Sequence, residues 1–148
     1  MRVGDILKVK SSSTIYSIAP DDKLSEAVAM MVERDVGSLV VMSQGEMIGL
    51  ITFREVLAQL HRQGGNLSGT PVEQVMVRDP KCGNPQDTVD QMRAVMTEHH
   101  IRYLPIKDGQ RLIGVLSFHD VARAALKAAS LENRALKEYI KNWPEPDQ

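Results

Sequence analysis

The chain of 148 residues has little cysteine, no long apolar run and no excess of either charge. Its single cysteine, Cys82, cannot form a disulfide within the chain, which favours a reducing compartment. The apolar run at residues 39–42 falls far below the ~20 residues that a membrane helix needs. Lys and Arg number 18 against 19 Asp and Glu, so no basic surface for nucleic acid is indicated. Together with an N-terminus that shows no apolar leader region, these absences predict a cytoplasmic protein without a membrane or nucleic-acid partner.

Residue sets that bind metals or carry catalysis are also missing. The four histidines and the one cysteine show no spacing that suits zinc. His99 and His100 are adjacent, so on a helix they would point about 100° apart and could not easily share one metal. No pair of carboxylates and no nucleophile beside a base stands out. We therefore expect no metal site and no enzymatic activity.

An internal duplication is the dominant feature that the sequence does have. At an offset of 65 residues, the segment 20–57 aligns with 85–122 without a gap, and ten of the 38 positions are identical. Upstream, residues 3–7 resemble residues 72–76 at an offset of 69. A stretch rich in glycine and polar residues separates the copies. The predicted organisation is a first repeat (1–61), a linker (62–71), a second repeat (72–128) and a C-terminal helix with tail (129–148).

Each repeat shows the hydrophobic pattern of a β-α-β-β-α unit. In the first repeat we expect a strand at 15–18, a helix at 24–34 with Asp21 or Asp22 as N-cap, strands at 38–42 and 47–52, and a helix from Phe53 or Arg54. In the second repeat we expect a helix at 88–99, strands at 103–107 and 112–117, and a helix from His119. Turns are expected at 44–45 and 108–109, and a capping box at 70–73 predicts a short helix that begins the second repeat. The fold class is α+β, with two repeats related by a pseudo-twofold axis, a core shared between facing sheets, and a C-terminal helical extension.

The junctions between the last strand and the last helix of each repeat carry a family resemblance. They read GLITFRE at residues 49–55 and GVLSFHD at 114–120, each with a glycine, two apolar residues, a Thr or Ser, and an acidic residue three positions later. With the duplication, these motifs resemble the tandem cystathionine-β-synthase (CBS) domain pair, also called a Bateman module, over about residues 1–127. The resemblance implies a regulatory, non-catalytic module that binds adenine nucleotides in clefts between the repeats.

The resemblance also implies roles for individual residues. The hydroxyls of Ser117 and Thr52 would contact phosphate, and the carboxylates of Asp120 and Glu55 would accept hydrogen bonds from ribose hydroxyls. Arg102 would add a phosphate contact. The base would lie against the segment before each Pro-Asp or equivalent turn. The candidates there are Ile15, Tyr16, Ser17 and Ile18 in the first repeat, and Pro80, Lys81, Cys82 and Gly83 in the second.

The two implied sites are unequal. The first repeat has Glu55 where the second has Asp120, and Gly37 where the second has Arg102. The extra methylene of Glu55 displaces its carboxylate by about a bond length. We therefore expect the Asp120 site to bind a nucleotide better than the Thr52 and Glu55 site. For Ser117 and Asp120 the alternative role is that of a helix N-cap and its partner.

The sequence leaves the ligand open among AMP, ADP, ATP, NAD and S-adenosylmethionine, because all of them present an adenosine. A ligand-free scaffold of the same fold is the alternative function. The last helix carries apolar residues at spacings of three, four and seven, which include Ala122, Leu126, Leu136, Ile140 and Trp143. This pattern favours a homodimer, and an unidentified downstream protein is expected to sense the ligand.

Overall fold

The computed structural model describes residues 1–9, 14–67 and 69–141, so Trp143 lies outside the described residues. The first repeat contains β1 (Ser17–Ile18), α2 (Leu24–Arg34), β2 (Ser38–Ser43), β3 (Glu46–Thr52) and α3 (Phe53–Arg62). The second contains α4 (Val89–Glu98), β5 (Tyr103–Asp108), β6 (Arg111–Ser117) and α5 (Phe118–Lys141). Helix α1 (Val3–Val9) precedes the first repeat, and a 3-10 helix, η1 (Val72–Gln74), and β4 (Val77–Arg78) precede the second.

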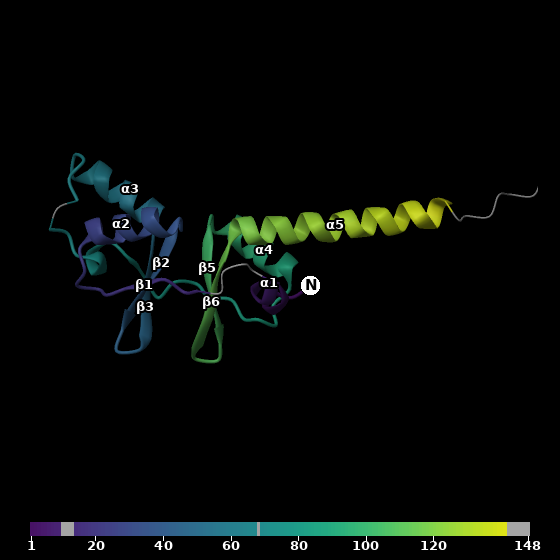
Figure 1. Cartoon of the computed structure of the whole chain (residues 1–148), viewed down its shortest axis with the longest axis horizontal. Helices are drawn as coiled ribbons and strands as arrows, with labels where there is room; N and C mark the ends of the chain where they lie inside the picture. The colour runs from purple at the N-terminus through teal and green to yellow at the C-terminus, as the bar shows by residue number, and fades with distance from the viewer. Residues whose placement is uncertain (10–13, 68, 142–148) are drawn as a thin grey trace, which may run out of the picture.

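The strands of the two repeats lie in the middle of the molecule. Helices α2 and α3 lie on the side of the first repeat, and α4 and α5 lie on the side of the second (Figure 1). Strands β1 to β4 form one sheet in sequence order, with β1 parallel to β2 and the other neighbours antiparallel. Strands β5 and β6 form an antiparallel hairpin, beside which Gly83 makes a parallel bridge to Ile106. The expected α+β repeat pair is confirmed.

The two hairpins have the turn chemistry that their residues favour. In the first, Ser43 pairs with Glu46 across Gln44 and Gly45, which have φ angles of 52° and 80°. Two successive residues with positive φ match the twist of the strands that they join, and glycine adopts this conformation without steric cost. In the second hairpin the loop is residues 109–110, one residue later than predicted, because Asp108 pairs with Arg111.

The expected helix caps were wrong at two places. Lys23, not Asp21 or Asp22, is the N-cap of α2, and the Asp22 carboxylate instead accepts the backbone N–H of Ala19 at 3.0 Å. Pro71, not Thr70, is the N-cap of η1, because the Thr70 hydroxyl donates to the Gln63 side chain at 3.4 Å. The Asp22 side chain thus bonds within the preceding turn, a known competitor of helix capping, and the Thr70 side chain bonds to the C-cap residue of α3. The predicted strand at 15–18 is also shorter, since only its last two residues pair as β1.

Each repeat is completed by the segment that leads into the other. The backbone N–H groups of Val3 and Gly4 donate to the carbonyls of Asp87 and Pro85, at 2.9 and 3.0 Å. In the equivalent positions of the other repeat, the N–H groups of residues 72 and 73 donate to the carbonyls of residues 22 and 20, at 2.8 and 2.9 Å. The two segments are thus exchanged between the repeats, since each one packs on the repeat that it does not lead into. This exchange explains why residues 3–7 resemble residues 72–76 at an offset of 69 rather than 65.

Buried apolar side chains form two clusters rather than the single shared core that we expected. One cluster gathers Val3 and Ile6 of α1 with the second repeat, and the other gathers Val72 and Met76 with the first. In each cluster the strands of one repeat pack against the helices beside them. The region between the two repeats is therefore available for a pocket.

Glycines at equivalent places in β3 and β6 make room for the exchanged segments. A Cβ on Gly49 would lie 2.5 Å from the Met76 sulfur and 2.8 Å from the Val77 carbonyl oxygen. A Cβ on Gly114 would meet only the Leu7 side chain, at 3.0 Å. The first contact includes backbone that cannot move without breaking the β3–β4 pairing, whereas the second involves the end of a flexible side chain.

We predict different costs for the two equivalent substitutions. Gly49→Ala should lower the free energy of unfolding by about 1–3 kcal/mol, the usual cost of overpacking. Gly114→Ala should change it by less than about 1 kcal/mol, because the Leu7 side chain can rotate away. Urea unfolding followed by circular dichroism measures both. Equal losses for the two variants would contradict the assignment of Gly49 to this packing role.

Candidate functional site

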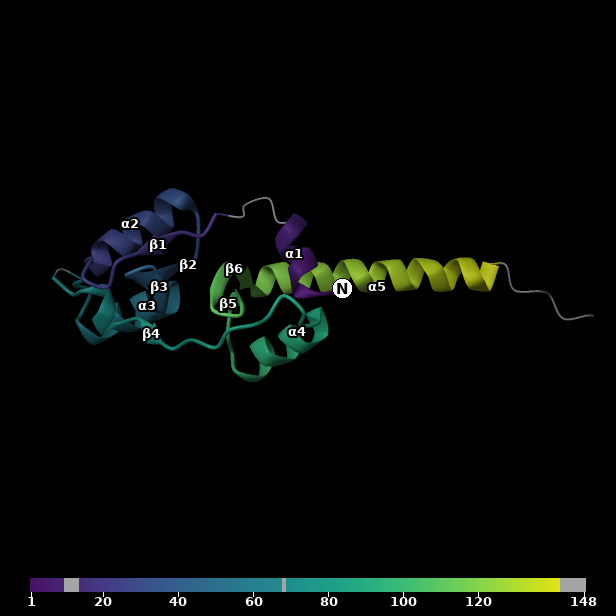
Figure 2. The same cartoon turned by 90° about the horizontal axis from the view of Figure 1, so that it is seen from below.

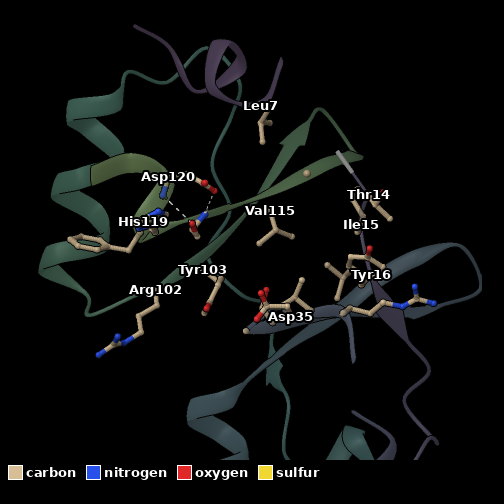
Figure 3. Close-up of a pocket in the computed structure, with 18 of the residues that line it drawn as sticks. Leu7, Thr14, Ile15, Tyr16, Asp35, Arg102, Tyr103, Val115, His119 and Asp120 are labelled. Atoms are coloured by element: carbon tan, nitrogen blue, oxygen red, sulfur yellow. Dashed lines mark hydrogen bonds between the residues drawn. The ribbon is translucent and has the colours of Figure 1, made fainter. Parts of the chain in front are cut away.

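A pocket of about 720 Å³ lies between the two repeats (Figure 3). From the first repeat it is lined by the segment before β1, the connection from α2 to β2, and the start of α3. From the second repeat it is lined by β6 and the first turn of α5, and α1 adds Leu7. The predicted site residues that line it are Ile15, Tyr16, Arg102, Ser117 and Asp120. Neither repeat alone provides this set.

Ser117 and Asp120 form a reciprocal cap at the start of α5. The Ser117 backbone N–H donates to the Asp120 carboxylate at 3.0 Å, and the Asp120 N–H donates to the Ser117 hydroxyl oxygen at 3.0 Å (Figure 3). The expected capping role is therefore present. The Ser117 hydroxyl proton has no acceptor among residues 1–9, 14–67 and 69–141, so this group can donate toward the pocket.

Thr52 and Glu55 hold the equivalent places in the first repeat, but their bonding differs. The Glu55 oxygen Oε1 accepts both the backbone N–H of Thr52 at 3.0 Å and the Thr52 hydroxyl at 2.9 Å. The longer side chain of glutamate reaches back to the hydroxyl, whereas the two bonds described between Ser117 and Asp120 both use backbone N–H donors. The Thr52 hydroxyl proton is thus used within its own cap, whereas the Ser117 hydroxyl can donate toward the pocket. Neither residue lines the pocket between the repeats.

The remaining base-side candidates lie outside the pocket lining. Ser17 is exposed and Ile18 is buried in the core of the first repeat. The Lys81 ammonium lies 3.2 Å from the His99 ring nitrogen Nε2. Gly83 is packed in the core, where an added Cβ would lie 2.8 Å from Ile106. Ser17 and Ile18 differ in exposure because they are neighbours in β1, and neighbouring side chains of a strand face opposite sides of the sheet.

An aromatic and cationic contact joins the repeats at the edge of the pocket. The rings of Phe53 and Tyr103 meet edge to face with centroids 6.2 Å apart, and the Arg102 guanidinium lies 5.7 Å from the Phe53 centroid. The Tyr103 hydroxyl occupies the place that a side chain at Gly37 would take. Gly37 stands where the second repeat has Arg102. Because Gly37 has no side chain, the Tyr103 ring can reach across the boundary between the two repeats.

Sequence reasoning missed Arg34, Asp35 and His119, which line the pocket. Arg34 packs its guanidinium 5.6 Å from the Tyr16 ring centroid, and Asp35 caps α2 in the left-handed conformation with a φ of 53°. His119 lies on the first turn of α5, where its Nε2 is 2.9 Å from Arg123 Nη2. Because arginine only donates, the His119 nitrogen accepts in this contact. The local sequence signals were the charges at the end of α2 and the place of His119 within the junction motif at residues 114–120.

The surroundings of the pocket residue Tyr103 shift its acid–base behaviour clearly. Partial burial raises the pKa of its phenol above the usual value, the Arg102 charge lowers it, and the Asp120 carboxylate raises it further. The net effect keeps the hydroxyl protonated. The direction follows from the low polarity of the site, which disfavours the phenolate.

This shift predicts a loss of stability at alkaline pH. Because the folded-state pKa lies above that of the unfolded chain, the unfolded state loses its proton first, so stability falls as the pH rises from about 10 through the folded-state pKa. Tyr103→Phe should remove this part of the decline, whereas Tyr139→Phe, on the exposed part of α5, should keep it. Urea unfolding across this pH range measures the effect. Identical pH profiles for wild type and Tyr103→Phe would contradict it.

Within the described ranges, no three His, Cys, Asp or Glu side chains gather as a metal site would require. None of the helices there is at once long and apolar enough to cross a membrane.

Comparisons with known proteins agree with the duplication. The CBS domain family model matches residues 3–62 and again residues 72–127. The CBS domain-containing protein YhcV of Bacillus subtilis is 30% identical over 116 residues, which are 78% of this chain and 82% of that protein. The mitochondrial CBS domain-containing protein CBSX3 of Arabidopsis thaliana is 32% identical over 146 residues, 93% of this chain and 71% of that protein.

Solved structures share the fold. A protein with CBS domains from Burkholderia ambifaria superimposes with a TM-score of 0.81 and 32% identity, over 86% of this chain and 95% of its own. CBSX2 in complex with AMP gives a TM-score of 0.71 at 24% identity, over 86% and 98% of the two chains. The CBS domain pair of MJ0100, in complex with 5-methylthioadenosine and S-adenosylmethionine, gives 0.74 at 21%, over 86% and 98%. Since a family match covers each half of the duplication, the chain belongs to the CBS domain family and contains a tandem pair of these domains.

Proposed function

We propose that this chain is a non-catalytic sensor that binds one adenosine-containing nucleotide in the pocket between its repeats. The observation that carries the proposal is the Ser117 and Asp120 pair, which faces the Ile15 and Tyr16 segment of the other repeat across the pocket. The pocket volume of about 720 Å³ lies within the usual range for small-molecule sites. The complexes of CBSX2 with AMP and of MJ0100 with S-adenosylmethionine support this ligand class.

In the proposed complex, Asp120 binds the ribose. A cis-diol offers two hydroxyl donors, and a carboxylate offers about four lone-pair sites on two oxygens. In this proposal the Asp120 carboxylate keeps its bond to the Ser117 N–H, at 3.0 Å, and accepts the two ribose hydroxyls. The same N–H bond fixes the carboxylate in place before the ligand arrives, so little orientation is lost on binding.

The phosphate would lie at the start of α5. Backbone N–H groups and the helix dipole favour an anion at this end of a 24-residue helix. The Ser117 hydroxyl can donate to it, and His119 stands on the same turn. Arg102 rests over Phe53 with its guanidinium directed away from Asp120 (Figure 3), so in this proposal it turns from the ring to the phosphate.

The base would lie on the side of the first repeat. Ile15, Val36 and Val115 supply apolar surface, and the Tyr16 ring supplies an aromatic one. The Arg34 guanidinium makes a cation–π contact with the Tyr16 ring. AMP, ADP, ATP, NAD and S-adenosylmethionine all carry the adenosine that this arrangement would bind.

Because both repeats line the pocket, a bound nucleotide would favour the relative orientation in which both sets of contacts are made. A downstream protein with different affinities for the two orientations would then respond to the ligand. The Phe53, Tyr103 and Gly37 contact lies at the same boundary, so it is the place where such a change in orientation would be felt first.

The test compares two capping carboxylates. Asp120→Ala should weaken binding of the tightest of AMP, ATP, NAD and S-adenosylmethionine by about ten- to hundredfold, because hydrogen bonds to a charged group are lost. Glu55→Ala removes the equivalent cap of α3 and should leave that affinity within about twofold. Isothermal titration of ligand-stripped protein measures both affinities.

The paired variants separate ligand binding from helix stability. Both should lower the free energy of unfolding by about 1 kcal/mol, the usual cost of losing a cap. Equal affinities for Asp120→Ala and the wild type would contradict the assigned site. Wild-type protein that binds none of the four compounds would favour the ligand-free scaffold.

A further inference from the structure

The last helix runs out of the molecule. Its first turns pack on the core of the second repeat through Val121 and Ala124, which are 0% and 7% exposed. From residue 129 to residue 141 every residue is exposed. Both views show this half of α5 extending past α1 and α4 with no described element beside it (Figures 1 and 2). A lone helical stretch of this length is marginally stable in water.

One row of side chains on the projecting half has the spacing of a coiled coil. Leu126, Ala129, Asn133, Leu136 and Ile140 follow one another at intervals of three, four, three and four residues. Leu126, Leu136 and Ile140 are 72%, 56% and 63% exposed. These are the a and d positions of a heptad, with Leu126, Asn133 and Ile140 at a. This row lies on a different side of α5 from Val121 and Ala124, which pack on the core. The helix can therefore pack on the core and present the row to a partner at the same time.

We propose that this row pairs with the same row of a second copy of the chain, as a parallel two-stranded coiled coil. The flanking charges are complementary in this arrangement. Glu132 holds a g position and Lys137 the e position five residues later, and g and e′ residues at this interval face each other across a parallel pair. Twofold symmetry makes the ion pair twice.

Asn133 supports the same orientation. In a parallel pair it meets its own copy, so that each amide can donate to and accept from the other. A single asparagine at an a position is a known determinant of register and of two strands, at some cost in stability. In an antiparallel pair of the same rows, Asn133 would oppose Leu136, and Glu132 and Lys137 would no longer face each other. The antiparallel form would therefore bury an amide without a partner.

The test uses two leucines of similar exposure on the same stretch of helix. Leu136 lies in the row, whereas Leu131, 54% exposed, lies at an f position on the opposite side. Sedimentation and light scattering of the full chain over a concentration series should give twice the mass of one 16.5 kDa chain for the wild type. Leu136→Asp should restore the single-chain mass, and Leu131→Asp should not.

Each other outcome overturns the proposal. A monomeric wild type, a larger assembly, or a Leu136→Asp variant that stays dimeric would show that this row is not a dimer seam. Dissociation by both substitutions to the same degree would point to an unspecific apolar helix. A cooperative urea-unfolding transition shows that the repeats of each variant are folded. The nucleotide proposal does not depend on the result.

Orientation has its own measurement. In a Cys82→Ser background, Leu136→Cys should form a disulfide-linked dimer under mild oxidation, because d positions face each other in a parallel pair. An equimolar mixture of separate Asn133→Cys and Leu136→Cys chains should then give the two homodimers. Predominant cross-linking between the two different variants would indicate the antiparallel arrangement and overturn the proposal.

Discussion

Each repeat of this chain folds around an apolar segment that precedes the other repeat. Val3 and Ile6 complete the second core, Val72 and Met76 complete the first, and equivalent backbone hydrogen bonds hold both segments in place. Neither repeat can be removed without leaving the other core open to water. This mutual dependence holds the two sheets beside each other, and the pocket at their boundary exists because of it. The glycine at 49 is part of the same constraint, since the Met76 side chain lies where its Cβ would be.

The duplication produced two equivalent strand-to-helix junctions, and a difference of one methylene separates their chemistry. Glutamate at 55 is long enough to bind the hydroxyl of Thr52, and so the cap of α3 satisfies itself. Aspartate at 120 accepts the backbone N–H of Ser117 in the reciprocal cap, and the serine hydroxyl can donate toward the pocket. Arg102 and Gly37 add a second asymmetry, because the missing side chain at 37 is what admits the Tyr103 ring to the boundary between the repeats.

Much of the fold and part of the site could be predicted from the sequence. The helix at 24–34 and the strands around it followed from hydrophobic periodicity, and the alignment of the two copies brought Ser117 and Asp120 to notice. Asp22 and Thr70 were misjudged as caps because a short polar side chain can bond to either of two nearby groups, and tertiary packing decides which. Leu7, Arg34 and Asp35 could not be found as pocket residues, since their position depends on the exchange of segments and on how the connection after α2 meets the second repeat.

The central claim is that one of two duplicated junctions forms the nucleotide site. The number of ligands bound per chain tests it most directly. Calorimetric titration of ligand-stripped wild-type protein with AMP, ATP, NAD and S-adenosylmethionine in turn should show saturable binding of at least one of them, with a single site per chain. Two equivalent sites per chain, or flat traces for all four compounds, would contradict the account.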